Sequence, residues 1–121
     1  MSTQKSCPSE HVEQREFVSW FRKNYPDVGL YAIPNGGKRG PATAARLRLE
    51  GVTPGIWDII IPTWFLWIEF KRVKTGTLSK EQREFGEARL KDGYHCMVAY
   101  GAEDAKDQII NGPRESWKRP R

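Results

Sequence analysis

Cysteines, histidines and long apolar runs are scarce in this sequence. Of its 121 residues only Cys7 and Cys96 are cysteines, too far apart for a disulfide framework or a zinc motif. The two histidines, His11 and His95, have no partner at metal-ligand spacing, so a histidine-type zinc site is not expected. The first residues are polar and every apolar run is shorter than a membrane span. We therefore expect no signal peptide, no membrane association and a protein that acts in the cytoplasm.

Hydrophobic residues make up 38% of the chain and include five Trp, five Phe and four Tyr. This composition is enough for one aromatic-rich core. We expect one domain at residues 9–112, preceded by a flexible N-terminus at 1–8 and followed by a basic tail at 113–121. The 20 Lys and Arg residues exceed the 15 Asp and Glu residues and give a net charge of +5. Such a charge suits a polyanionic partner such as nucleic acid, although solubility explains it as well.

Hydrophobic periodicity and turn residues predict four helices and four strands. Prolines and glycines mark several boundaries, and Ser79 with Gln82 has the form of a capping box. The strands at 57–61 and 65–70 should form an antiparallel hairpin, and a crossover helix should set strands 65–71 and 95–100 parallel. The sequence therefore predicts an α/β sandwich with a central mixed sheet flanked by helices. The predicted helices span 9–24, 42–50, 79–92 and 102–110, and the remaining strands span 28–33 and 94–100.

Two acids and a lysine lie at one end of the predicted hairpin. Glu69 and Lys71 share one face of their strand, and hairpin register brings Asp58 next to them. Burying charges among isoleucines is costly unless the charges are paired or bind a metal. Two carboxylates suit Mg²⁺ or Mn²⁺. The alternative is a salt bridge between Lys71 and either acid, which spacing alone slightly favours.

Three segments follow one another along the chain: Pro54-Gly55-Ile56-Trp57-Asp58, Ile68-Glu69-Phe70-Lys71 and Leu78-Ser79-Lys80-Glu81-Gln82. Their order resembles that of the PD-(D/E)xK nucleases. More narrowly, they resemble the virus-type replication-repair nuclease (VRR-NUC) domain of stand-alone phage and bacterial proteins. The resemblance covers residues 9–112 and includes Gly51 and the turn at 33–37. Trp57 departs from the proline that often precedes the aspartate, and should reshape the mouth of the site.

The resemblance implies a restriction-endonuclease-like fold and Mg²⁺- or Mn²⁺-dependent hydrolysis of DNA. It makes Asp58, Glu69 and the Phe70 carbonyl metal ligands and Lys71 the catalytic lysine. Gln82 would approach the same site, and the capping box offers a second, compatible explanation for it. Relatives of this type are associated with branched or Holliday-junction DNA, which suggests a role in replication, repair or recombination. A chain this small has little surface with which to grip a duplex, so we expect a homodimer with one active site for each strand. The rival hypothesis is a non-catalytic DNA-binding module with the same fold.

The resemblance also implies an acidic residue from the first helix at the metal. Glu10, Glu13 and Glu16 compete for this role. At about 100° per residue, Glu10 projects into the sector of Phe17 and Phe21, so we favour Glu10 over Glu13. A favourable interaction with the helix N-terminus would also explain an acid there.

A basic loop and helix precede the site and provide candidates for contacts with nucleic acid. A solvated basic face, or the preference of asparagine for turns, explains the same residues without a ligand. The candidates are Asn35, Lys38, Arg39, Arg46 and Arg48.

Overall fold

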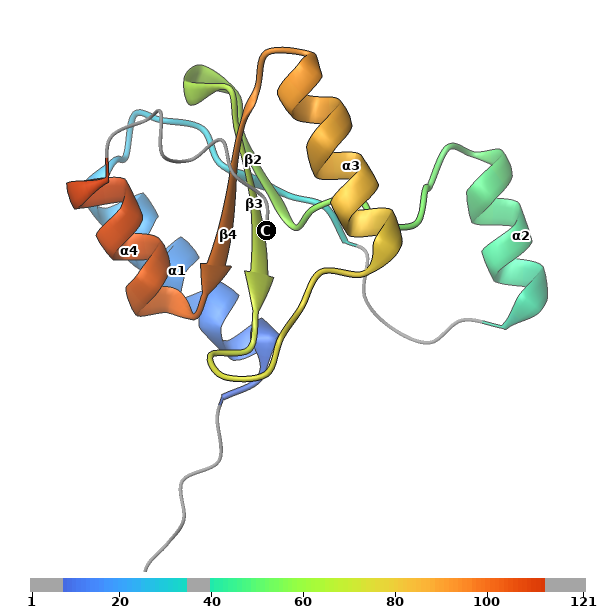
Figure 1. Cartoon of the computed structure of the whole chain (residues 1–121), viewed down its shortest axis with the longest axis horizontal. Coiled ribbons are helices and arrows are strands. Elements are labelled where there is room, and N and C mark those ends of the chain that lie inside the picture. The colour runs from blue at the N-terminus through green and yellow to red at the C-terminus, as the bar shows by residue number, and fades with distance from the viewer. Residues whose placement is uncertain (1–7, 35–39, 113–121) are drawn as a thin grey trace, which may run out of the picture.

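The structure is a computed structural model that describes residues 8–34 and 40–112. The expected flexible N-terminus, residue 8 apart, and the basic tail lie outside these ranges. No helix within them is long and apolar enough to cross a membrane. The described residues form four helices, four strands and one 3₁₀ turn (Figure 1). In order they are α1 (Glu10–Asn24), β1 (Tyr31–Ala32), α2 (Pro41–Leu49), β2 (Ile59–Ile61), η1 (Pro62–Trp64), β3 (Leu66–Lys71), α3 (Lys80–Lys91), β4 (His95–Tyr100) and α4 (Ala102–Asn111).

Serine caps begin the two helices that later contribute to the site. The Ser9 hydroxyl accepts a hydrogen bond from the Val12 amide at the start of α1. At the start of α3, the Ser79 hydroxyl accepts from the Gln82 amide, and the Gln82 side chain accepts from the Ser79 amide. The predicted capping box is therefore confirmed. Because these signals are local, the predicted bounds of both helices agree with the structure to within one residue.

The four strands form one sheet in the order β1-β2-β3-β4. β1 pairs antiparallel with β2, β2 antiparallel with β3, and β3 parallel with β4, so the predicted mixed sheet is confirmed. The strand predicted at 28–33 was too long, because β1 pairs only through Tyr31 with Ile60 and Ala32 with Ile59. The strand predicted from Trp57 begins instead at Ile59. The first correction concerns the edge strand β1, and the second concerns the start of β2, which pairs with β1 and β3 only through Ile59–Ile61.

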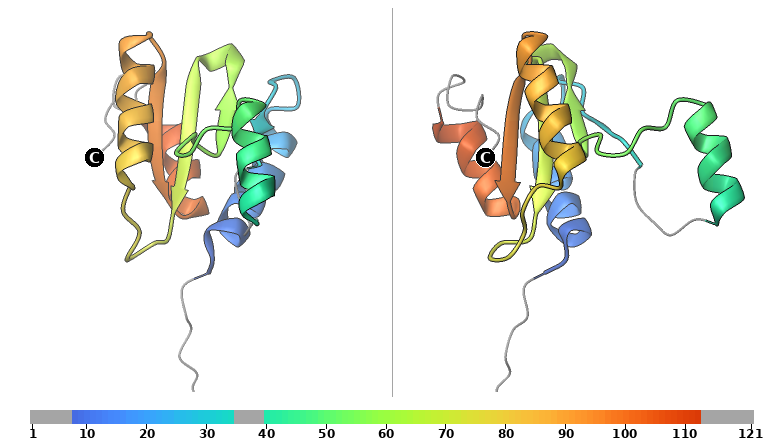
Figure 2. Two further views of the ribbon diagram at one scale, coloured as in Figure 1. Left: turned by 90° about the vertical axis from the view of Figure 1, so that its right-hand side faces the viewer. Right: turned by 45° about the vertical axis from the view of Figure 1, so that its right-hand side comes forward.

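Helices cover both faces of the sheet. α1 and α4 lie on one face, and α3 lies on the other (Figures 1 and 2). Phe17 and Phe21 of α1 pack in one core with the side chains of β3 that alternate from Leu66, whereas Trp67 packs with Phe85 of α3. Since neighbouring side chains of a strand point to opposite faces, Glu69 and Lys71 share the α3 face with Trp67.

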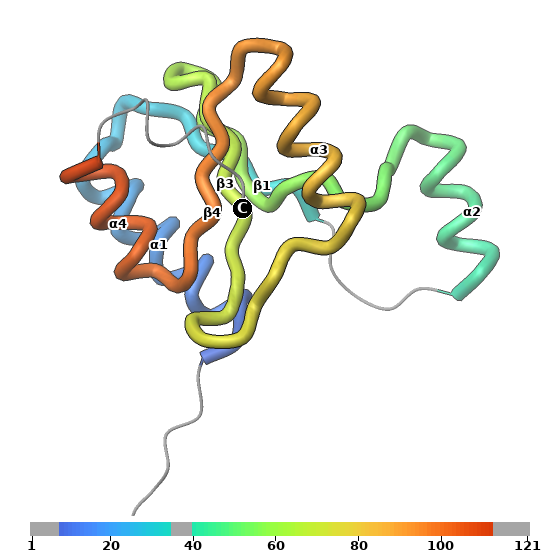
Figure 3. The backbone as a smooth tube through the Cα atoms, viewed as in Figure 1, coloured from blue at the N-terminus to red at the C-terminus, as the bar shows by residue number. Residues whose placement is uncertain are grey.

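Helix α2 stands apart from this body of the molecule (Figures 2 and 3). None of its residues is buried, and Leu49 at its end is 90% exposed. Packing against the rest of the described chain therefore contributes little to the stability of α2. An isolated helix of nine residues is only marginally stable in water.

Candidate active site

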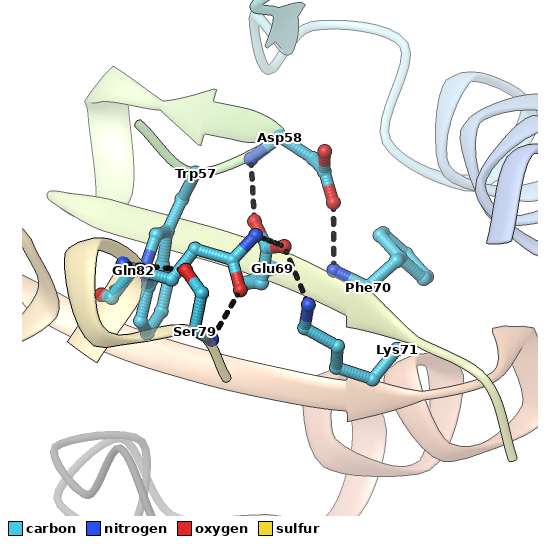
Figure 4. A network of polar contacts seen from close by, with 7 residues as sticks. All are labelled: Trp57, Asp58, Glu69, Phe70, Lys71, Ser79 and Gln82. Carbon is cyan, nitrogen blue, oxygen red and sulfur yellow. Dashed lines mark hydrogen bonds and ion pairs between the residues drawn. The ribbon is translucent and has the colours of Figure 1, made fainter. Parts of the chain in front are cut away.

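Asp58 and Glu69 interlock across the start of the β2–β3 hairpin. Ile59 pairs with Ile68, so the preceding residue Asp58 lies opposite Glu69. The Asp58 amide donates to Glu69 Oε1 at 3.2 Å, and the Phe70 amide donates to Asp58 Oδ2 at 2.8 Å (Figure 4). Each carboxylate is thus held by the backbone of the opposite segment. Hairpin register brings the two acids together as the sequence predicted.

Lys71 and Gln82 both reach the second oxygen of the Glu69 carboxylate. Lys71 Nζ lies 3.5 Å from Glu69 Oε2, and Gln82 Nε2 donates to the same oxygen at 2.8 Å (Figure 4). Glu69 is 2% exposed and Lys71 is 8% exposed. The salt bridge that spacing alone favoured is therefore present in the structure. Gln82 closes the capping box and contacts Glu69 at the same time, so both explanations of this residue hold.

Trp57 anchors the start of α3 rather than shaping the mouth of the site. Its indole is fully buried, and Nε1 donates to the Gln82 carbonyl oxygen at 2.8 Å. It does not line the cavity at Asp58. The expectation that Trp57 would reshape the mouth was therefore wrong, because the ring packs beneath α3 beside Phe85. Through the Gln82 backbone, Trp57 instead positions the amide that contacts Glu69.

The first helix contributes Glu10 to the cavity. A cavity of about 310 Å³ is lined by residues of α1 and the segment after β1, together with Asp58, Glu69 and Gln82. Glu10 lies in its wall, as helical projection predicted. Glu13 accepts a hydrogen bond from the Ala102 amide at 2.6 Å, and Glu16 forms an ion pair with Lys106 at 3.0 Å. These two glutamates thus have partners in α4, and a role of Glu10 at a metal stays a prediction.

His11, which the sequence left without a role, also lines this cavity, together with Gln14. Their spacing of three residues places both on one side of α1. The sequence alone shows that these two residues share one side of α1. It does not show that this side faces the cavity, because that depends on where β1 lies.

Two of the five predicted nucleic-acid contacts, Arg46 and Arg48, lie within the described ranges. Asn35, Lys38 and Arg39 lie outside the described residues. Arg46 and Arg48 are exposed on α2, as expected, and neither lines the cavity at Asp58. Arg46 is also paired with a carboxylate, Glu50, at 3.1 Å. Contacts between this basic group and nucleic acid stay a prediction.

A solved structure described as "VRR_NUC domain protein" is similar to this one. The TM-score is 0.71, and the similarity covers 87% of this chain and 88% of that chain at 23% sequence identity. The chain has the fold of that VRR-NUC domain protein. The fold expected from the sequence resemblance is thus confirmed. No protein-family model matches the chain, and no curated protein matches it significantly.

Burial in this VRR-NUC-like fold disfavours the ionised forms of Asp58 and Glu69. It raises the pKa of Asp58, and the charge of Glu10 raises it further while the Phe70 amide lowers it. Burial and the neighbouring Asp58 charge raise the pKa of Glu69 to about 8, although Lys71 opposes the shift. One lysine therefore does not neutralise the cluster, and an additional cation would stabilise its ionised form.

The donors at this VRR-NUC-like site suit a hard divalent cation. Within the described ranges, no group of three or more His, Cys, Asp or Glu side chains is placed to hold a metal. Mg²⁺, however, is commonly held by one or two carboxylates with waters and substrate phosphate. The Phe70 amide points toward Asp58, and the carbonyl of a strand residue points to the same edge as its amide. Asp58, Glu69 and the Phe70 carbonyl thus form an oxygen donor set that fits Mg²⁺ or Mn²⁺.

The raised pKa of Glu69 predicts how stability depends on pH without metal. Between its usual value of 4.5 and about 8, the folded protein keeps a proton that the unfolded chain has released. The free energy of unfolding should therefore fall as the pH rises through this window. Denaturant unfolding in EDTA should show that wild type loses on the order of 1–3 kcal/mol more than Glu69→Gln between about pH 5 and about pH 8. Parallel pH profiles of the two proteins would contradict this effect.

Proposed function

We propose that the chain is a VRR-NUC-type nuclease that hydrolyses phosphodiester bonds of DNA with Mg²⁺ or Mn²⁺. The observation that carries this proposal is the arrangement around Glu69. Its carboxylate is linked to Asp58 through a backbone hydrogen bond and is contacted by Lys71 and Gln82, at distances of 2.8–3.5 Å. A buried and a half-buried carboxylate beside a buried lysine, next to an open cavity, are suited to phosphoryl chemistry, in which charge develops on phosphate oxygens.

The residues have separate tasks in this proposal. Asp58, Glu69 and the Phe70 carbonyl hold the ion, with Glu10 as a further acidic group from α1. A bound ion would lower the pKa of a coordinated water and offset the charge of the phosphate. Lys71 holds its ammonium group where it can orient the attacking water or donate to a phosphate oxygen. Gln82 fixes one oxygen of Glu69 and thereby keeps the carboxylate oriented.

The rival hypothesis, a non-catalytic DNA-binding module, is supported by the ion pair between Lys71 and Glu69. The acids in the cavity weigh against it. Glu10, Asp58 and Glu69 all line one cavity, and in their ionised form they repel phosphate unless a cation lies between. A surface that only binds DNA gains from lysine and arginine at this place, not from three acids.

The proposal further includes branched DNA as the substrate and a homodimer as the active assembly. Helix α2 supports an assembly, since none of its residues is buried and Leu49 is almost fully exposed. Two copies would supply one active site for each strand of a duplex. A panel of linear, flap, splayed and four-way-junction substrates assigns the preferred DNA structure, and the mass in solution assigns the assembly. The resemblance further suggests a role in replication, repair or recombination.

Metal binding separates the enzyme from the module. Calorimetric titration with Mn²⁺ should show binding to wild type and its loss in Asp58→Asn, because this change removes a charged ligand and keeps the shape of the side chain. Glu16→Gln is the matched control. Glu16 is an acid of α1 that forms an ion pair with Lys106 of α4 and does not line the cavity at Asp58. No binding to wild type, or equal binding to Asp58→Asn, would favour the module.

A further inference from the structure

The cavity at Asp58 continues along the outer side of α1. A second cavity, of about 600 Å³, lies between this helix and β1. His11, Gln14 and Ala32 line both cavities, so the two form one groove that leads away from the acids. The second cavity is lined by His11, Gln14, Arg15, Val18, Ser19, Arg22 and Ala32.

The charge of the groove reverses along its length. The end at Asp58 is lined by three acids, whereas no acid lines the extension along α1. At about 100° per residue, His11, Arg15 and Arg22 project within a sector of roughly 40° on the helix. The remaining acids of α1 are turned toward α4, where they have hydrogen-bonding and ion-pair partners. A basic stripe on α1 therefore begins beside the acidic site.

The two arginines of this stripe are available to a ligand. Arg15 and Arg22 are exposed, and neither has an ion-pair partner in the described part of the chain. Other basic residues, such as Arg46, Arg89 and Lys106, have a carboxylate within 3.1 Å. Exposed arginines without a carboxylate partner retain their five donors for phosphate oxygens.

The length of the stripe fits a nucleic-acid strand. At 1.5 Å per residue, His11 and Arg22 are separated by roughly 16 Å along the helix axis. A B-form strand advances about 3.4 Å per nucleotide, so this distance spans on the order of five nucleotides. The groove is thus long enough for the backbone on one side of a scissile phosphate bound at the acids.

We propose that Arg15 and Arg22 bind phosphates of the DNA strand that leaves the active site along α1. This inference rests on the proposed nuclease function and adds the path of the substrate. The acids at one end require a cation before phosphate can approach, and the arginines at the other end attract phosphate directly. The reacting phosphate is thereby held through a cation at the acids, and the flanking phosphates are held by the arginines of the same groove.

Binding measurements test the path with a control on the same helix. Lys23 is exposed next to Arg22 but does not line the groove. It lines a neighbouring hollow with Trp20 and Lys106, which shares Arg15 with the groove but not Arg22. In Ca²⁺, which supports binding without requiring turnover, Arg15→Ala/Arg22→Ala should bind a DNA oligonucleotide about tenfold more weakly than wild type, or worse. The slope of log K against log salt should become shallower by roughly 2. The single variants Arg22→Ala and Lys23→Ala each remove one positive charge. Only Arg22→Ala should weaken DNA binding and make the salt dependence of log K shallower.

Cleavage of shortened substrates tests the position of the strand. Arg22→Ala should raise KM and leave kcat unchanged, since Arg22 lies far from the reacting atoms. The difference from wild type should vanish when the substrate is shortened on one side of the cut, because the phosphate that contacts Arg22 is then absent. Equal effects of Arg22→Ala and Lys23→Ala, or a difference that persists on every shortened substrate, would overturn the proposed path while wild-type cleavage still supports the nuclease. Wild type that neither binds nor cuts DNA would overturn both.

Discussion

Lys71→Met should lower the rate of metal-dependent DNA cleavage by about 10²–10⁴-fold. Methionine keeps the apolar length of the side chain and removes the ammonium group that lies 3.5 Å from Glu69 Oε2. The reacting phosphate and water then lose the donor that compensates charge in the transition state. Single-turnover cleavage at saturating Mn²⁺ is the measurement, because the loss should appear in the chemical step and not in DNA binding.

Lys106→Met is the matched control for this variant. Lys106 is also a partly buried lysine in ion pairs, with Glu16 and Glu103 at 3.0 and 3.1 Å, but it lies between α1 and α4. It should cut at the wild-type rate. Removal of Lys71 also raises the pKa of Glu69, because the lysine charge favours the ionised acid, so protons compete more strongly with metal. Saturation with metal must therefore be verified for Lys71→Met, and cleavage within a few-fold of wild type would exclude Lys71 from catalysis.

Gly55→Ala should destabilise the fold more than any other change discussed for this site. Gly55 has a φ of +86°, and a Cβ built on it lies 2.6 Å from the backbone carbon of Glu81 in the first turn of α3. The left-handed conformation costs about 1–2 kcal/mol, and overpacking against a rigid backbone costs about 1–3 kcal/mol more. We expect a loss of about 3 kcal/mol and a decrease in Tm of roughly 10 °C or more. Thermal unfolding followed by circular dichroism measures it.

Gly93→Ala separates the two causes of this loss. Gly93 has a similar φ of +95°, but nothing lies within 4 Å of a Cβ built there. It should therefore lose only the conformational part, about 1–2 kcal/mol. If both variants lose the same amount, the contact between the loop before Asp58 and the first turn of α3 does not matter for stability. If Gly55→Ala loses more, that contact also fixes the turn from which Gln82 reaches Glu69.

The sequence was sufficient for the features that depend on local geometry. The capping box at Ser79 and Gln82 predicted the start of α3, and strand alternation with hairpin register brought Asp58 next to Glu69 and Lys71. Each inference uses neighbours along the chain or one short hairpin. The same reasoning left the salt bridge and the metal site as alternatives. The structure contains the salt bridge between Lys71 and Glu69. The oxygen atoms of Asp58 and Glu69 also fit a divalent metal ion.

Features that depend on packing between distant segments were missed. Trp57 looked like a residue of the mouth, but it is buried under α3, which begins more than twenty residues later. β1 was predicted too long because only its antiparallel partner decides where pairing stops. The groove beside Arg15 and Arg22 exists only because α1 lies next to β1, so helical periodicity alone does not reveal it.

The most direct test of the central claim is cleavage of labelled DNA by the purified chain with and without metal. Wild type should cut in Mg²⁺ or Mn²⁺ and stop cutting in EDTA, and Asp58→Asn should be inactive in either metal while its unfolding remains cooperative. Cleavage that survives in EDTA, or Asp58→Asn that cuts as fast as wild type, would contradict a metal-dependent nuclease built on Asp58 and Glu69.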